Sequence, residues 1–203
     1  MTPAPYYSDE YVTLYHGDCR EVLPSVTQPI DAVITDPPYP NNAGHFTDAV
    51  EVAEAVLVTF PAPHWFVFWH PLQRPPVPLP LVGLHIWHRT NTNRPDNYEP
   101  IYEFAADGRE KACRVFPFAV IHPDLTGCRE ATGHPTQKNV KLMRRIVNLT
   151  TGTILDPFSG SGSTLDAAKS MGRKAIGVEL DERYCEIAAK RLAQGVLDFG
   201  ASA

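Results

Sequence analysis

The sequence predicts an α/β fold with a mostly parallel central sheet and helices on both faces. At both ends of the chain, short runs of branched apolar residues alternate with segments of helical periodicity. This alternation is typical of β-α-β units. In addition, a glycine-rich stretch, "DPFSGSG", follows one predicted strand and opens a predicted helix, which is typical of α/β proteins that bind a nucleoside.

The N-terminal part of the chain predicts several short strands and two helices. The stretch "DAVIT" at 31–35 is rich in branched apolar residues, and 48–60 has apolar residues at helical spacing. The proline-rich stretch 71–80 must be irregular or extended. The expected strands are 11–18, 31–35, 65–69, 81–89, 99–107 and 115–120, and the expected helices are 18–25 and 48–60.

The C-terminal part predicts an alternation of helices and strands. The helix expected over 139–150 places Val140, Met143, Ile146 and Val147 on one face. Asp181 is the candidate N-cap of the last helix. The remaining expected helices are 165–172 and 181–195, and the remaining expected strands are 153–156 and 174–180.

Length and composition favour one domain over 1–203 that carries no metal and does not cross a membrane. The 203 residues are 43% apolar and 20% charged, as in ordinary globular proteins. No apolar run reaches the roughly 20 residues that a membrane span requires. The N-terminus does not read as a signal peptide, and the four cysteines form no C-x-x-C pair. We therefore expect free thiols and a cytoplasmic protein.

The stretch "DPPY", Asp36 to Tyr39, follows a predicted buried strand. Pro37 and Pro38 cannot continue a sheet or a helix, so the stretch is at least a turn. An alternative is that it holds rigid hydrogen-bond acceptors beside an aromatic face, where a planar polar group would bind.

The glycine-rich turn and a later acid together indicate a nucleoside cofactor. Gly160 and Gly162 permit a tight turn, and Glu179 at the end of the next expected strand is placed to bind ribose hydroxyls. The turn lacks both a third glycine at G-x-G-x-x-G spacing and a P-loop lysine. Asp156, which opens the turn, would repel phosphates but accept hydrogen bonds from an ammonium group. S-adenosylmethionine therefore fits better than NAD or ATP. The alternative is that Asp156 only caps the turn.

These motifs resemble those of the amino-methylating DNA methyltransferases, which modify adenine N6 or cytosine N4. "DPPY" resembles their catalytic motif, "DPFSGSG" their cofactor motif, and "HPTQK" at 134–138 the segment before the cofactor motif. "GDC" at 17–19 lies where members place an Asp near the cofactor's adenine. The catalytic motif comes first, as in the beta group. The resemblance implies a Rossmann-like methyltransferase fold with a circularly permuted motif order.

The resemblance also implies roles for individual residues and partners. The catalytic residues that it implies are Asp36, Pro37, Pro38 and Tyr39. Its residues for S-adenosylmethionine are Asp18, Cys19, Thr136, Lys138, Asp156, Phe158, Gly160, Gly162 and Glu179. For Lys138 and Thr136 the expected partner is the carboxylate of the cofactor. DNA is the implied substrate, and homodimers are common in the family.

Little of the chain is left for recognising a DNA sequence. A small target-recognition insertion is expected within 71–133, where Trp87, Arg89 and Arg94 are candidate DNA contacts. The net charge of −5 does not by itself indicate nucleic-acid binding. Adenine N6 is the expected target, because Asp rather than Ser precedes Pro-Pro-Tyr. Cytosine N4, another amino group, an NAD-dependent oxidoreductase and a non-catalytic DNA-binding protein remain alternatives.

Overall fold

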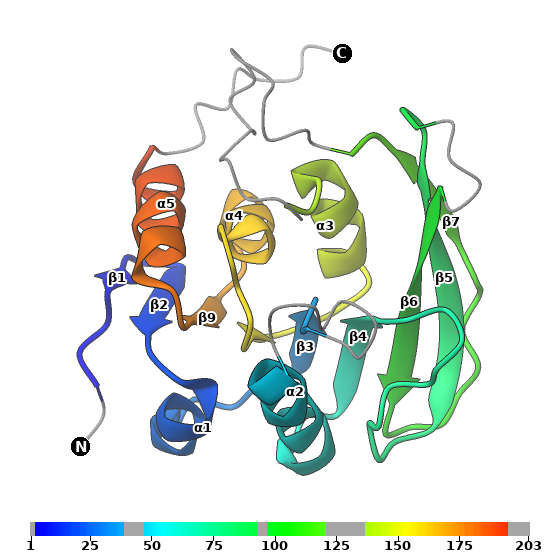
Figure 1. Ribbon diagram of the computed structural model, residues 1–203, viewed down its shortest axis with the longest axis horizontal. Coiled ribbons are helices and arrows are strands. Elements are labelled where there is room, and N and C mark those ends of the chain that lie inside the picture. The colour runs from blue at the N-terminus through cyan, green and yellow to red at the C-terminus, as the bar shows by residue number, and fades with distance from the viewer. Residues whose placement is uncertain (1–2, 39–46, 93–96, 121–136, 195–203) are drawn as a thin grey trace.

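The computed structural model describes residues 3–38, 47–92, 97–120 and 137–194 (Figure 1). The strands are β1 (Tyr7–Ser8), β2 (Val12–His16), β3 (Ala32–Thr35), β4 (His64–Phe68), β5 (Leu81–Arg89), β6 (Tyr98–Ala105), β7 (Val115–Phe118), β8 (Ile154–Asp156) and β9 (Ala175–Glu179). The helices are α1 (Cys19–Val22), the 3₁₀ turn η1 (Leu23–Ser25), α2 (Thr47–Thr59), α3 (Val140–Val147), α4 (Ser163–Ser170) and α5 (Glu182–Ala193).

All described strands belong to one sheet with the order β1-β2-β9-β8-β3-β4-β6-β5-β7. The strands from β2 to β4 in this order run parallel to one another, and β1 pairs antiparallel with β2. Beyond β4 the sheet continues with antiparallel β6 and β5, and β7 closes it parallel to β5. Helices α3, α4 and α5 cover one face and α1 and α2 the other (Figure 1). The predicted α/β class and mostly parallel central sheet are therefore confirmed.

The expected strands and helices are all present in the described part of the chain, with ends shifted by a few residues. The two-residue strand β1 was not predicted, because it is too short to show a period. Strands β5, β6 and β7 take much of the interval 71–133 into the sheet. In the described ranges, no helix combines the length and apolar character needed to cross a bilayer.

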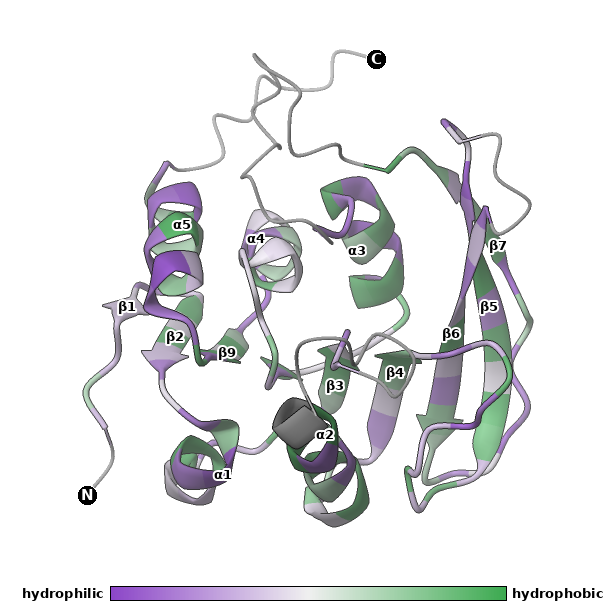
Figure 2. Cartoon of the chain, in the orientation of Figure 1, coloured by the Kyte–Doolittle hydropathy of each residue, from purple (hydrophilic) through white to green (hydrophobic). Residues whose placement is uncertain are grey.

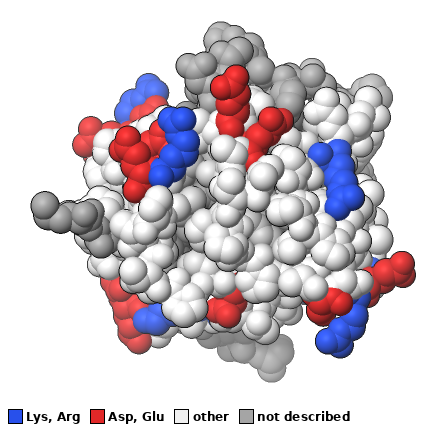
Figure 3. Space-filling view, turned by 90° about the horizontal axis from the view of Figure 1, so that it is seen from below, with Lys and Arg blue, Asp and Glu red and all other residues white. Residues whose placement is uncertain are grey.

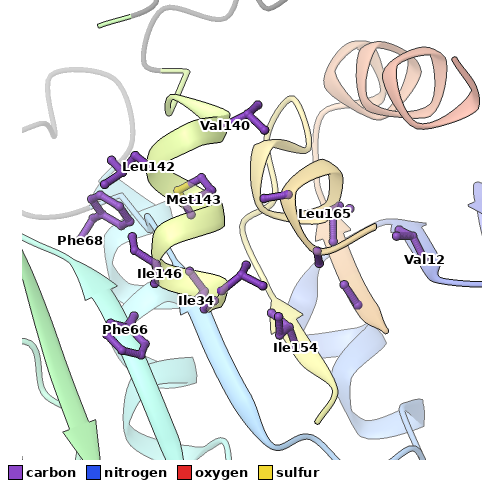
Figure 4. Packing of buried hydrophobic residues seen from close by; sticks show 14 of the residues in the cluster. Val12, Ile34, Phe66, Phe68, Val140, Leu142, Met143, Ile146, Ile154 and Leu165 are labelled. Atoms are coloured by element: carbon purple, nitrogen blue, oxygen red, sulfur yellow. The ribbon is translucent and has the colours of Figure 1, made fainter. Parts of the chain in front are cut away.

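Helix α3 shows how the core is built. Its residues Leu142, Met143 and Ile146 are buried and point toward the sheet, where Phe66 and Phe68 of β4 meet them (Figure 4). Each such side chain stabilises the fold by roughly 1.5–3 kcal/mol through burial. The strands are largely hydrophobic, while the outer sides of the helices carry the hydrophilic residues (Figure 2). This packing fixes α3, and with it the residues just before it, against the end of β4.

A buried polar cluster crosses β4, β5 and β6. The carboxylate of Glu103 lies 2.8 Å from His64 Nε2 and 2.9 Å from His85 Nε2. The backbone N–H of Arg114 donates to His85 Nδ1, so His85 carries its proton on Nε2 and donates it to Glu103. Burial alone would raise the pKa of Glu103, but the hydrogen bonds from His64 and His85 lower it to about 2.

We expect Gly83→Ala to destabilise the protein by about 1–3 kcal/mol. A Cβ atom at this position would lie 2.8 Å from Glu103 Oε2 and 3.3 Å from His85 Nε2, and the carboxylate cannot retreat without breaking its bonds to the histidines. Thermal or urea unfolding measures the change. Gly83 is not in the left-handed region, so without the clash the substitution would stabilise the fold. A variant as stable as the wild type would contradict this prediction.

Candidate active site

The "DPPY" and "DPFSGSG" motifs meet at the carboxyl edge of the parallel strands. β3 and β8 are parallel neighbours, with Val33 opposite Leu155. Asp36, which follows β3, and Asp156, the last residue of β8, therefore leave the sheet side by side. The helix after β3 lies on one face and the helix after β8 on the other (Figure 1). Ligands of open α/β sheets bind at such a divergence of neighbouring strands.

Asp36 is paired with a lysine that lies far away in sequence. Lys138 Nζ lies 2.5 Å from Asp36 Oδ2, and the Asp36 side chain is 23% exposed. Desolvation raises the pKa of Asp36 to about 6, although Lys138 favours the ionised form. The carboxyl group is thus fixed through one oxygen and is mostly ionised, and so a strong acceptor, at neutral pH.

Lys138 also binds a second carboxylate, that of Glu99 on β6. Lys138 Nζ lies 3.2 Å from Glu99 Oε1, and Arg89 Nη2 lies 2.8 Å from Glu99 Oε2. The lysine is 10% exposed and the glutamate 5%. Burial would raise the pKa of Glu99, but Lys138 and Arg89 together lower it. The two carboxylates and two cations form one neutral network.

The structure brings together only part of the predicted catalytic motif. Pro37 is buried and Pro38 half-buried directly after Asp36. Tyr39 and Thr136 lie outside the described residues, so their predicted roles stay predictions. The predicted contact of Lys138 with a cofactor carboxylate also stays a prediction, but the structure shows this ammonium already neutralised by two protein carboxylates.

Asp156 is held inside the glycine-rich turn. Thr164 Oγ1 donates to its Oδ2 at 2.6 Å, and the N–H of Phe158 donates to its Oδ1 at 3.2 Å. Asp156 is 3% exposed, and burial raises its pKa to about 7 although Thr164 opposes that rise. This geometry fits the alternative in which Asp156 caps the turn. Phe158 is half-buried and packs against the core.

Glu179 and the turn are joined by a hydrogen bond. The N–H of Gly160 donates to Glu179 Oε2 at 2.7 Å, and the N–H of Asp181 donates to Oε1 at 2.8 Å. Burial raises the pKa of Glu179. Gly162 has φ +78°, and a Cβ there would lie 3.0 Å from the Cβ of Ala188. Gly162 therefore serves the start of α4 and its packing on α5, whereas Gly160 and Glu179 form the turn's polar edge.

The "GDC" segment lies beside Glu179, and its predicted place near the cofactor's adenine stays a prediction. The N–H of Gly17 donates to the carbonyl of Glu179. Asp18 caps α1 and pairs with Arg20, at 2.6 Å between Oδ2 and Nη2. Cys19 is 5% exposed, and burial raises the pKa of its thiol to about 11. Its side chain belongs to the core and to a groove between α1 and α2.

The residues of this edge fit a nucleoside cofactor without phosphates. A partly buried carboxylate, that of Glu179, stands next to the turn and is anchored through Gly160. The turn itself, 156–162, contains no basic residue. One buried hydroxyl in it, Ser159 Oγ, has no hydrogen-bond partner among the described residues. Among the same residues, no cluster of His, Cys, Asp or Glu is arranged to hold a metal.

The predicted DNA contacts are not brought together on a surface. Trp87 is only 2% exposed, and its Nε1 donates to the carbonyl of Phe118. The expectation that its ring contacts DNA is therefore wrong for this structure: the ring is part of the core. Arg89 lies over the Trp87 ring and is held by Glu99. Arg94 lies outside the described residues.

Glu99 is the residue that the sequence analysis missed. It was predicted only as part of a strand. The available signal was the pair of acids, Glu99 and Glu103, in an otherwise apolar strand. Their spacing places both on one face, and a buried acid requires a partner. The partners, Lys138 and the histidines, come from distant segments.

Comparison with known proteins identifies the family. A family model for N6/N4 DNA methylases matches residues 68–190, which is more than half of the chain. The chain therefore belongs to the DNA methylases that modify exocyclic amines, as the motifs implied.

Two curated relatives are type II methyltransferases. M.ScaI of Streptomyces caespitosus is 26% identical over 254 aligned positions, covering 93% of this chain and 83% of the relative. M2.LlaDCHI of Lactococcus lactis subsp. cremoris is 39% identical over 118 residues, covering 54% of this chain and 41% of the relative. The chain thus spans less than half of M2.LlaDCHI but most of M.ScaI.

Two solved structures share the fold. The M1.HpyAVI–SAM complex has a TM-score of 0.63 and 25% identity, and covers 89% of this chain and 99% of that chain. The cytosine-N4-specific PvuII DNA methyltransferase has a TM-score of 0.67 but 18% identity, and covers 98% of this chain and 90% of that chain; it supports the fold alone. S-adenosylmethionine is the cofactor to which the family and M1.HpyAVI point, in agreement with the sequence analysis.

We expect Glu179→Gln to weaken binding of S-adenosylmethionine by about 10- to 100-fold, because a charged acceptor is lost at the turn. Isothermal titration calorimetry measures the dissociation constant. Glu186→Gln on α5 is a matched control, since Glu186 is exposed and pairs only with Lys190 among the described residues. Equal affinities of the two variants would contradict a role of Glu179 in cofactor binding.

Proposed function

We propose that this protein transfers the methyl group of S-adenosylmethionine to adenine N6 of DNA, and that Asp36 and the residues after it hold the target base. The observation that carries the proposal is the position of Asp36 beside the glycine-rich turn, on neighbouring parallel strands. A base at Asp36 and a nucleoside cofactor at Gly160 and Glu179 would then be adjacent.

Asp36 would act on the lone pair of the target amine. In adenine this lone pair is delocalised into the ring, so the amine is a poor nucleophile. The Asp36 carboxylate can accept one N–H, and the carbonyl of Pro37, held by the fixed φ of proline, can accept the other. Both acceptors favour tetrahedral nitrogen by positioning and preorganised electrostatics.

The reaction then needs no strong base. When bound, S-adenosylmethionine supplies an electrophilic methyl group on its sulfonium. The lone pair of the amine forms the new N–C bond as the C–S bond breaks, and the nitrogen afterwards releases its proton to water. Tyr39 would stack on the base, which must be flipped out of the duplex to reach this edge. Such stacking contributes about 1–3 kcal/mol.

DNA would approach the carboxyl edge of the sheet. On the face shown in Figure 3, acidic and basic side chains of the described residues are scattered between broad uncharged areas, with no continuous basic strip. That face is therefore a poor site for a polyanion. Because β5, β6 and β7 belong to the sheet, the described part of 71–133 offers little separate structure for target recognition. A homodimer would widen the contact surface and stays a prediction.

Asp36→Ala should lower methyl transfer to DNA by at least about 100-fold while leaving the affinity for S-adenosylmethionine within about twofold, because Gly160 and Glu179 are unchanged. A radioactive methyl-transfer assay and calorimetry measure the two quantities. Asp107→Ala removes an exposed carboxylate at the opposite end of β6 and should retain activity. Turnover of Asp36→Ala at the wild-type rate would overturn the proposal.

The target atom is tested on nucleosides. DNA and RNA incubated with the protein and labelled S-adenosylmethionine are digested and separated by mass spectrometry. We expect N6-methyldeoxyadenosine from DNA. N4-methyldeoxycytidine would support the cytosine alternative, and label only in RNA would reject DNA as the substrate. Sequencing of modified bases in DNA from cells that express the protein then gives the sequence context.

A further inference from the structure

Glu99 is a buried acid that the proposed chemistry does not yet use. It lies at the start of β6, next to Tyr98, on the same side of the sheet as Trp87 of β5, its partner in the register. Its carboxylate is 5% exposed and is bound on one oxygen by Lys138 and on the other by Arg89. Glu99 thus binds two cations, Lys138 and Arg89, and shares the first of them with Asp36.

We propose that Glu99 is a positioning residue of the methyl-transfer site, which acts through Lys138 to determine how the Asp36 carboxylate is presented to the target amine. This inference rests on the proposed function of Asp36.

The geometry gives Glu99 control over the lysine. Lys138 Nζ lies 2.5 Å from Asp36 Oδ2, which leaves Oδ1 of Asp36 as the oxygen for the target N–H. On its other side the ammonium is held 3.2 Å from Glu99 Oε1, and it lies 4.9 Å from the centre of the Phe68 ring. Without the charge of Glu99, the Lys138 ammonium would bind Asp36 alone. It would then compete with the target amine for both oxygens of Asp36.

Each charged neighbour of Asp36 either favours or disfavours ionisation of its carboxyl group. Lys138 and Arg89 favour the ionised form of Asp36, whereas Glu99 disfavours it. Asp156, on the neighbouring strand, also carries a carboxyl group that interacts with that of Asp36. Since the ionised carboxylate is the stronger acceptor of an N–H, burial of Asp36 and these neighbouring charges together set the pH at which methyl transfer becomes efficient.

The test is the pH dependence of kcat at saturating DNA and S-adenosylmethionine, between about pH 5 and pH 9. The wild type should lose activity on the acid side of about pH 6, where Asp36 is protonated. Glu99→Gln should move this acid limb to lower pH by about one unit, because a like charge is removed. Its plateau should fall about tenfold, because Lys138 now binds Asp36 more tightly.

Arg89→Gln is the second variant and predicts the opposite direction. Arg89 is 28% exposed, so its loss is tolerated more easily than that of Glu99. Removing its positive charge should move the acid limb to higher pH. A role of Arg89 in DNA contact would appear in KM, whereas saturating DNA isolates the effect on kcat.

Glu103→Gln is the matched control for a merely structural effect. Glu103 lies four residues along β6 on the same face and is equally buried, but it pairs with His64 and His85. We expect this variant to lower the melting temperature without moving the acid limb.

Opposite shifts in Glu99→Gln and Arg89→Gln, with the affinity for S-adenosylmethionine within about twofold of wild type, support the inference. Profiles of both variants that coincide with wild type or with Glu103→Gln overturn it. If the profiles coincide but Asp36→Ala is inactive in the same assay, only the role of Glu99 is rejected and the proposed function stands. If Asp36→Ala is active, the proposed function itself fails.

Discussion

The parallel pairing of β3 with β8 is the constraint on which the site depends. It places Asp36 and the glycine-rich turn at one edge, although the two motifs lie at opposite ends of the chain. The pairing is buried on both faces, by α3 and α4 on one side and α2 on the other, and β3 is entirely apolar up to Thr35. A slip of either strand by one residue would exchange the side chains packed on one face of the sheet for those packed on the other. The relative position of the two motifs is therefore as rigid as the core.

The second element of the site is a buried charge network. Asp36, Lys138, Glu99 and Arg89 come from the end of β3, the chain before α3, β6 and β5. Burying any one of these charges alone would cost much desolvation free energy, and removing one partner leaves an uncompensated buried charge. Because the two acids and two bases balance, no uncompensated charge is buried, and the carboxylate of Asp36, the proposed ligand of the target base, is held through one oxygen. The Lys138 ammonium lies 4.9 Å from the centre of the Phe68 ring and 5.8 Å from the centre of the Trp87 ring, within the range of cation–π attraction.

The antiparallel extension of the sheet explains two findings together. β6 and β5 continue the sheet beyond β4, so Trp87, which the sequence offers as a candidate DNA contact, becomes a core residue. The same extension delivers Glu99 to the edge where Lys138 and Asp36 meet. A segment expected to contact DNA thus supplies Arg89 and Glu99 to the buried network at the candidate active site. Its second buried acid, Glu103, is kept ionised by two histidines instead and serves the interior of the sheet.

Sequence alone determined the fold class, the order of strands and helices, and the two motifs, because period, turn residues and short motifs are local properties. The runs "DAVIT" and "AIGVE" are apolar over the length of a strand, and "SGSG" permits only a turn. Sequence could not decide which strands are neighbours, and hence which charges share a buried space. Lys138, for which a contact with the cofactor stays a prediction, lies between Asp36 and Glu99, and Asp156 is bonded within its own turn. The pairing of Lys138 with Asp36 joins residues that are 102 positions apart in the sequence, and only the packed sheet brings them within hydrogen-bond distance.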